Sequence, residues 1–242
     1  MSSPIPRRVR DAAVFFLGDE GADAWVRNAE ATQVELLQRW ELVPGEPFTG
    51  GVLSLCLPCS DCQGRTVVLK LPIEPETGRL EADALECLAD TRAAPLVLGR
   101  DERSGALLMS YVAAPRPYEP RGTRHDVAEF EALLQLLRGG LSDGLPPLNR
   151  NIQMRTRWAI DRFRLPANRQ GRVFLSTAES FVNPLLASSP SEFVHGDLQA
   201  KNILATPASL VAIDPFACFG DPLFDAAFWA VMLPGPEPIE SV

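Results

Sequence analysis

The chain reads, from residue 193 to residue 204, Phe193-Val194-His195-Gly196-Asp197-Leu198-Gln199-Ala200-Lys201-Asn202-Ile203-Leu204. Asp214 follows at the end of the next apolar run, so Asp197, Asn202 and Asp214 all flank segments typical of buried strands. Transfer of a phosphoryl group from ATP needs a carboxylate that accepts the proton of the attacking hydroxyl, and oxygen ligands that hold Mg²⁺ against the phosphates. This order of side chains supplies both and predicts a phosphoryl-transfer centre.

The motif His-Gly-Asp-Leu-x-x-x-Asn-Ile-Leu, followed by Ile-Asp, resembles the catalytic and metal-binding loops of the aminoglycoside phosphotransferase family, which is related to the protein kinases. The resemblance implies an α+β, two-lobed, protein-kinase-like fold with a small β-rich N-terminal lobe and a mostly helical C-terminal lobe. It implies that ATP is the phosphate donor and that Asp197 is the catalytic base. It further implies that Asn202 and Asp214 bind Mg²⁺ and that His195 supports the loop.

The first lobe of such a kinase needs a lysine on a strand to hold the phosphates, and Lys70 ends the apolar run that starts at Thr66. The chain has 23 basic residues, of which two, Lys70 and Lys201, are lysines. Because arginine is used nearly everywhere else, we expect the lysine of a buried strand to contact phosphate. Glu81 and Glu86 could both orient it from the following helix, and the family pattern Glu-Ala-x-Ala-Leu favours Glu81.

Two weaker features belong to the same nucleotide site. Gly50 and Gly51 precede the first strand of a predicted hairpin, where they would let the backbone approach the phosphates closely, although such a pair is also typical of a simple turn. The segment 107–112 resembles the interlobe hinge of the family. This implies that backbone groups of Ser110 and Val112 bind adenine.

Apolar spacing and turn residues divide the chain near three closely spaced prolines, at positions 115, 117 and 120. We predict a nucleotide-binding lobe over 1–112 and a catalytic and substrate lobe over 113–242. Helices are predicted at about 22–42, 78–90, 126–138, 153–164, 177–186 and 223–232, and strands at 52–57, 66–71, 96–98, 106–112, 202–205 and 210–213.

Charge and composition exclude several classes of protein. A net charge of −8 argues against nucleic-acid binding, and no apolar run approaches the roughly 18 residues of a membrane span. Five cysteines, an odd number, fit a reducing compartment, so we expect the cytoplasm, where ATP is available. Residues 192–242 carry seven acids and one base, which would attract metal ions and a small cationic substrate.

Finer motifs narrow the resemblance. Ile213-Asp214-Pro215 and Gly220-Asp221-Pro222 resemble the aminoglycoside and hydroxyurea kinase branch of the family, which includes streptomycin 6-kinases. The resemblance spans about 45–231 and implies phosphorylation of streptomycin at its 6-position, and hence antibiotic resistance. Family members continue for several helices beyond the position of Trp229, so we expect an incomplete substrate pocket in a chain that stops at residue 242.

Several alternatives stay open. A catalytically silent nucleotide-binding protein, or a kinase of another small hydroxylated metabolite, would share these motifs. Lys201 stands beside the catalytic carboxylate where relatives have other residues, and it could assist the transferring phosphate or face solvent. Asp221 and Asp225 could contact substrate amines or stabilise the loop, and we favour the second role.

Two further clusters have ordinary interpretations. Cysteines 56, 59 and 62, with Cys87, could ligate zinc or an iron–sulfur cluster, but strand alternation points the first two to opposite faces. His125 lies at a predicted helix start, where Thr123 or Asp126 could cap the helix, and is expected to be a surface residue. The sequence carries no signal for a particular oligomeric state.

Overall fold

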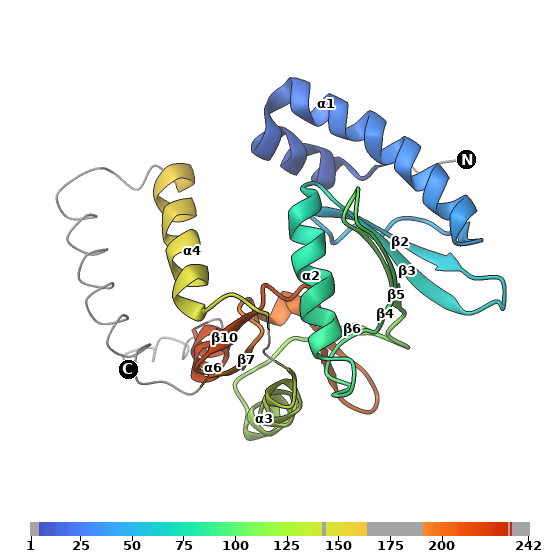
Figure 1. Ribbon diagram of the computed structural model, residues 1–242. Coiled ribbons are helices and arrows are strands. Elements are labelled where there is room, and N and C mark those ends of the chain that lie inside the picture. The colour runs from blue at the N-terminus through green and yellow to red at the C-terminus, as the bar shows by residue number, and fades with distance from the viewer. Residues whose placement is uncertain (1–4, 142–143, 164–190, 232, 234–242) are drawn as a thin grey trace, which may run out of the picture. The chain divides into compact units, whose positions relative to one another are not determined.

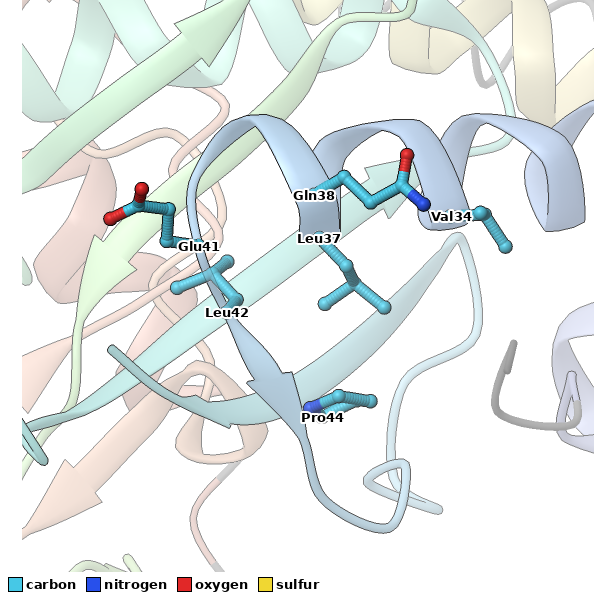
Figure 2. Close-up of a pocket in the computed structure, with 6 residues that line it drawn as sticks. All are labelled: Val34, Leu37, Gln38, Glu41, Leu42 and Pro44. Atoms are coloured by element: carbon cyan, nitrogen blue, oxygen red, sulfur yellow. The ribbon is translucent and has the colours of Figure 1, made fainter. Parts of the chain in front are cut away.

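The computed structural model describes residues 5–141, 144–163, 191–231 and 233, and the helix predicted at 177–186 lies outside them (Figure 1). The chain forms two compact units, one of Met1–Glu86 with Pro95–Ala113 and one of Cys87–Ala94 with Ala114–Val242. The segment Cys87–Ala94 contributes Leu88 and Ala93 to the core of the second unit. In the described part of the chain, the helices are all too short or too polar to cross a membrane.

The first unit is built on a five-stranded antiparallel sheet with the order β1-β2-β3-β5-β4. Its strands are β1 (Val43–Pro44), β2 (Ser54–Ser60), β3 (Thr66–Pro72), β4 (Val97–Asp101) and β5 (Ala106–Ser110). The predicted hairpin is β2–β3, and Asp61 closes its turn by accepting the amides of Gln63 and Arg65 at 2.9 and 2.8 Å. The central strand β3 carries Lys70 opposite Cys56 of β2.

Two helices, α1 (Arg7–Arg39) and α2 (Pro75–Cys87), accompany the sheet (Figure 1). The prediction of a single helix at 22–42 was wrong about the start, because the helix already begins at Arg7 and is interrupted at Gly18, whose φ is 74°. The residues before Gly18 pack against Ala22 and Ile73. Leu36 and Leu37 pack on the sheet, so the last turns of α1 cover part of its apolar surface.

The first turn of α2 closely approaches the turn between β4 and β5. A Cβ atom at Gly78 would lie 2.0 Å from the carbonyl oxygen of Gly105, and one at Gly105 would lie 2.2 Å from that of Pro75. Gly105 also has a φ of 68°, a conformation that other residues rarely adopt. Glycine at these positions is therefore what lets α2, and Glu81 with it, lie so near the sheet.

The second unit combines helices with short strands. Its elements are α3 (Arg124–Arg138), α4 (Leu148–Phe163), α6 (Leu223–Ala230), the 3₁₀ turn η1 (Ala200–Asn202), and the strands β6 (Arg116–Pro117), β7 (Glu192–Val194), β8 (Ile203–Ala205), β9 (Leu210–Ala212) and β10 (Cys218–Gly220). The hairpin β8–β9 pairs with β6, and β7 pairs with β10. Stacking of Phe130 on Trp229, with ring centroids 4.2 Å apart, joins α3 to α6 in the core.

The close approach of α2 to the β4–β5 turn predicts a stability effect. Gly105→Ala should lower the free energy of unfolding by about 2–5 kcal/mol, because left-handed backbone costs about 1–2 kcal/mol and overpacking adds about 1–3 kcal/mol. Gly64→Ala is the matched control, since Gly64 also has a positive φ, of 74°, but no atom within 4 Å of its added Cβ. Urea titration of both variants measures their free energies of unfolding. An equal decrease in the two variants would show that the contact between α2 and the β4–β5 turn does not exclude a side chain at position 105.

Candidate active site

The loop that carries His195, Gly196 and Asp197 leaves β7 at Val194 and is anchored by one buried carboxylate. Asp225 of α6 is 2% exposed and accepts the backbone amides of His195 and Gly196 at 2.7 and 2.9 Å. Asp221 accepts the amide of Leu223 at 2.9 Å and so shapes the entry to α6. Asp225 therefore stabilises the loop, the role that we favoured for it, whereas Asp221 makes a local contact at the start of α6.

The ring of His195 is fully buried and locks the start of the loop. Its Nδ1 accepts the amide of Asp197 at 3.3 Å, and its Nε2 lies 3.1 Å from the carbonyl oxygen of Ile213. Burial lowers the pKa of His195 to about 4, so the ring is neutral, with its proton on Nε2 directed at Ile213. The ring thus ties the loop to Ile213, directly after β9.

Gly196 has a φ of 78° and no space for a side chain. A Cβ atom there would lie 2.2 Å from the carbonyl oxygen of Phe216 and 2.7 Å from Nδ2 of Asn151. The glycine of the motif is therefore required by both conformation and packing.

Asp197 and Asn202 lie side by side, as the motif predicts. Nδ2 of Asn202 donates to the backbone oxygen of Asp197 at 2.9 Å and to its Oδ2 at 2.7 Å, and Nε2 of Gln199 donates to Oδ1 at 2.8 Å. The 3₁₀ turn η1 brings Asn202 back to the carboxylate. Lys201 is mostly exposed, and its Nζ lies 4.0 Å from Oδ2 of Asp197. The carboxylate is thus held from both of its oxygens.

Asn202 and Asp214 fit a magnesium ion by donor chemistry. Among the described residues, the side-chain hydrogen bonds of Asn202 are all donated by Nδ2, which leaves Oδ1 as a ligand atom. Asp214 follows β9 and is exposed, with a φ of 56° that is uncommon outside glycine and that aspartate tolerates. Hard oxygen atoms of this kind are the ligands that Mg²⁺ prefers.

In the first unit, Lys70 and Glu81 form a buried ion pair. Nζ of Lys70 lies 2.7 Å from Oε1 and 2.6 Å from Oε2 of Glu81, and the two residues are 5% and 8% exposed. Glu86 lies instead on the exposed side of α2, 3.4 Å from Arg100. Of the two acids that the sequence offered, Glu81 is the one that contacts the lysine.

The remaining predicted nucleotide-binding residues also lie in the first unit. Gly50 has open space around it, whereas a Cβ at Gly51 would lie 3.0 Å from the carbonyl oxygen of Ser54. Ser110 ends β5, and its amide donates to the carbonyl oxygen of Leu96 at 2.9 Å. Val112 lies beyond β5, outside the ladder. The amide of Ser110 is therefore engaged within the sheet.

The cysteines and His125 take part in ordinary structural contacts. Cys59 is buried and its thiol lies 3.7 Å from the carbonyl oxygen of Leu57, while Cys62 is exposed. No three metal-binding side chains gather anywhere in the described ranges. His125 lies at the surface, 3.6 Å from Glu129, and Thr123 caps α3 in a capping box with Asp126.

Arg155 of α4 also belongs to this site, and the sequence reasoning missed it. Its Nη2 donates to the carbonyl oxygen of Gly196 at 2.5 Å and to Oδ1 of Asp197 at 3.1 Å. The sequence gives almost no signal for this contact, because Arg155 precedes Asp197 by 42 positions in a chain rich in arginine.

The buried ion pair predicts unequal effects of two substitutions on one helix. Glu81→Ala should lower the free energy of unfolding by about 3–5 kcal/mol, because it leaves the charge of Lys70 buried without its partner. Glu86→Ala removes an exposed contact and should cost less than about 1 kcal/mol. Chemical denaturation of the two variants checks this, and similar losses would contradict the importance of the buried pair.

The buried carboxylate of Asp225 predicts a pH effect on stability. Burial raises the pKa of Asp225 to about 7 from its ordinary value of 3.8, although the amides of His195 and Gly196 oppose this. The native state then keeps a proton that the unfolded state loses, so this group's contribution to the free energy of unfolding falls as pH rises from about 4 to about 7. The lowered pKa of His195 has the opposite effect, with stability rising between about 4 and 6.5.

Asp225→Asn separates the two contributions because it removes the titrating carboxyl. It keeps one of the two oxygen acceptors, and the loss of the second lowers stability by an amount that does not depend on pH. The unfolding free energy of the wild type minus that of the variant should fall between pH 4 and pH 7. Urea titrations across this range measure it, and a difference that does not change with pH would contradict the raised pKa.

The sequence of the chain is similar to that of a known family of kinases. The model of the aminoglycoside/hydroxyurea antibiotic resistance kinases matches residues 39–237. A streptomycin 6-kinase from Streptomyces glaucescens is 28% identical in an alignment of 233 residues, and the alignment covers 91% of this chain and 72% of that protein.

Two solved structures resemble the fold. A choline/ethanolamine kinase family protein from Mesorhizobium loti has a TM-score of 0.61 at 20% identity, over 84% of this chain and 68% of that one. The ternary complex of streptomycin, ATP and APH(2″)-IIa has a TM-score of 0.58 at 16% identity, over 81% of this chain and 73% of that one. These similarities confirm the predicted α+β, protein-kinase-like fold. Since the family model covers most of its length, the chain belongs to the aminoglycoside/hydroxyurea antibiotic resistance kinases.

Proposed function

We propose that the protein transfers the γ-phosphate of ATP to a hydroxyl group of an aminoglycoside, with the 6-hydroxyl of streptomycin as the leading acceptor, and thereby confers resistance. The observation that carries the proposal is the carboxylate of Asp197, which Asn202 and Gln199 hold from both oxygens in a loop of kinase type. The relative from Streptomyces glaucescens, a streptomycin 6-kinase, supports the choice of acceptor.

In this proposal, Asp197 is the catalytic base. It orients the acceptor hydroxyl and takes its proton as the hydroxyl oxygen bonds to the γ-phosphorus and the bond to ADP breaks. Lys70 neutralises charge on the phosphates, and Glu81 keeps its ammonium group in place at 2.6 Å. Mg²⁺, when bound to Asn202 and Asp214, would neutralise further charge on the transferring group.

The other nucleotide contacts follow from the family resemblance. Backbone groups at Ser110 and Val112 would hold adenine, and the backbone at Gly50 and Gly51 would lie against the phosphates. The open space around Gly50 is compatible with that approach. Since ATP is a cytosolic nucleotide and an odd number of cysteines, five, fits a reducing compartment, we propose the cytoplasm as the location of the enzyme.

The acidic segment that follows β7 supports a cationic acceptor. Residues 192–242 carry seven acids and one base, and a polycationic aminoglycoside would be attracted to such a region. Lys201 is the exception, with its Nζ 4.0 Å from the catalytic carboxylate. This cation favours a second candidate function, phosphorylation of another small hydroxylated compound that carries less positive charge.

A screen of acceptors distinguishes these functions from a silent nucleotide-binding fold. ATP consumption by the purified full chain with Mg²⁺ should rise on addition of streptomycin and stay at its basal rate with hydroxyurea or choline. Activity with one of the less charged compounds would favour the second candidate. Activity with none of them, in a protein that binds ATP, would contradict both kinase assignments.

Substitution of the catalytic base gives a sharper prediction. Asp197→Ala should lower kcat by about 10²- to 10⁴-fold, the usual contribution of a general base, while nucleotide affinity is kept. Asp90→Ala, at an exposed aspartate, serves as the control and should match the wild type. Steady-state kinetics and calorimetric titration with ATP measure both quantities. Undiminished turnover of the Asp197 variant would exclude this residue as the base.

A further inference from the structure

Arg155 approaches the catalytic loop from α4, an element outside the kinase motifs. One of its guanidinium nitrogens, Nη2, lies 2.5 Å from the carbonyl oxygen of Gly196 and 3.1 Å from Oδ1 of Asp197. A single side chain thus contacts both the backbone of the loop and the carboxylate that the loop presents. Oδ1 also receives a hydrogen bond from Nε2 of Gln199, at 2.8 Å.

The guanidinium group is itself held from several sides. Its Nε donates to Oδ1 of Asn151 at 2.9 Å, and its central carbon lies 5.3 Å from the ring centroids of both Phe216 and Phe228. Asn151 is 3% exposed and donates to the carbonyl oxygen of Phe216 at 2.8 Å. Contacts from α4, from the segment after Asp214 and from α6 therefore hold the guanidinium group of Arg155.

The contact between Arg155 and Asp197 contributes more to the orientation of the carboxylate than to electrostatic attraction. The side chains of Arg155 and Asp197 are 31% and 18% exposed, so solvent screens part of their attraction. A planar guanidinium that also donates to Asn151 and Gly196 can, however, fix the rotation of a carboxylate, which is otherwise broad. Lysine cannot replace it, because one ammonium group cannot reach Asn151, Gly196 and Asp197 in the same arrangement.

We propose that Arg155 is a positioning residue that fixes the rotation of the Asp197 carboxylate and so aims it at the acceptor hydroxyl. This rests on the proposed role of Asp197 as the base. Arg155 acts through Asp197 and the Gly196 carbonyl, with Asn151 as its support. A displacement of about 1 Å at a reacting group can cost about 10²-fold in rate, which sets the size of the expected effect.

Kinetics of variants on α4 test this role. Arg155→Ala should lower kcat by about 10²-fold and change the KM for ATP less than about twofold. Arg155→Lys, which keeps the charge, should recover less than about a tenth of the lost activity. Arg150→Ala is the control on the same helix, since Arg150 is exposed, and it should match the wild type. Free guanidinium ion at a sub-denaturing concentration should restore part of kcat to Arg155→Ala.

The opposite results overturn the proposal. A kcat of Arg155→Ala within twofold of the wild type would do so, as would a loss that merely follows the fraction of folded protein by circular dichroism. Full recovery with Arg155→Lys would show that charge alone is needed.

A structural readout separates this inference from the proposed function. Crystal structures of the wild type and of Arg155→Ala should show the carboxylate of Asp197 rotated in the variant, while the bonds of His195 and Gly196 to Asp225 are retained. An unrotated carboxylate would overturn the inference. If the wild type phosphorylates none of the acceptors tested, the proposed function fails, and the comparison of the two structures still decides the role of Arg155.

Discussion

One buried carboxylate holds the backbone on which the candidate active site depends. At the end of β7 the chain turns, and the amides of His195 and Gly196 would be left without partners in a buried place. An unpaired buried amide costs about 1–3 kcal/mol, and here the two oxygens of Asp225 accept one amide each. Burial of that carboxylate has its own cost, visible as a pKa raised to about 7. The hydrogen bonds to Asp225 thus stabilise the position of the loop, and removing the carboxylate from water costs part of that free energy.

The other features of the site follow from this anchor. With residues 195 and 196 fixed, the ring of His195 can accept the Asp197 amide and donate to the carbonyl oxygen of Ile213. η1 then returns Asn202 to Asp197, and Ile213, which lies between the end of β9 and Asp214, is tied to the same ring. Most of these contacts lie within residues 193–225, so the loop is largely organised by its own sequence. Arg155 and Asn151 are the contribution of α4 from outside that segment.

The sequence predicted best where a contact is local or a residue type is rare. Asn202 follows Asp197 by five positions, a spacing that one turn can close, and Lys70 was conspicuous as one of two lysines. The β2–β3 hairpin was predicted from its turn residues and confirmed. Glu81 was preferred to Glu86 through family resemblance, and the structure pairs it with Lys70.

Other features had no local signal. Strands β7 and β10 have three residues each, too few to show an alternating pattern, and they pair across 24 positions from Val194 to Cys218. The early start of α1 was missed because Gly18 interrupts its periodicity. Arg155 reaches Asp197 through tertiary packing that no spacing rule describes. The substrate and the roles of the site residues stay predictions, since they depend on ligands that side-chain geometry alone does not identify.

The anchor at Asp225 can be measured directly by amide hydrogen exchange of the wild-type protein, followed by NMR. The amides of His195 and Gly196 should exchange as slowly as those of the paired strands β8 and β9, because each is buried and donates to a carboxylate oxygen. Exchange of these two amides at the rate of an unprotected amide would contradict the account, since the loop would then lack the support on which its geometry depends.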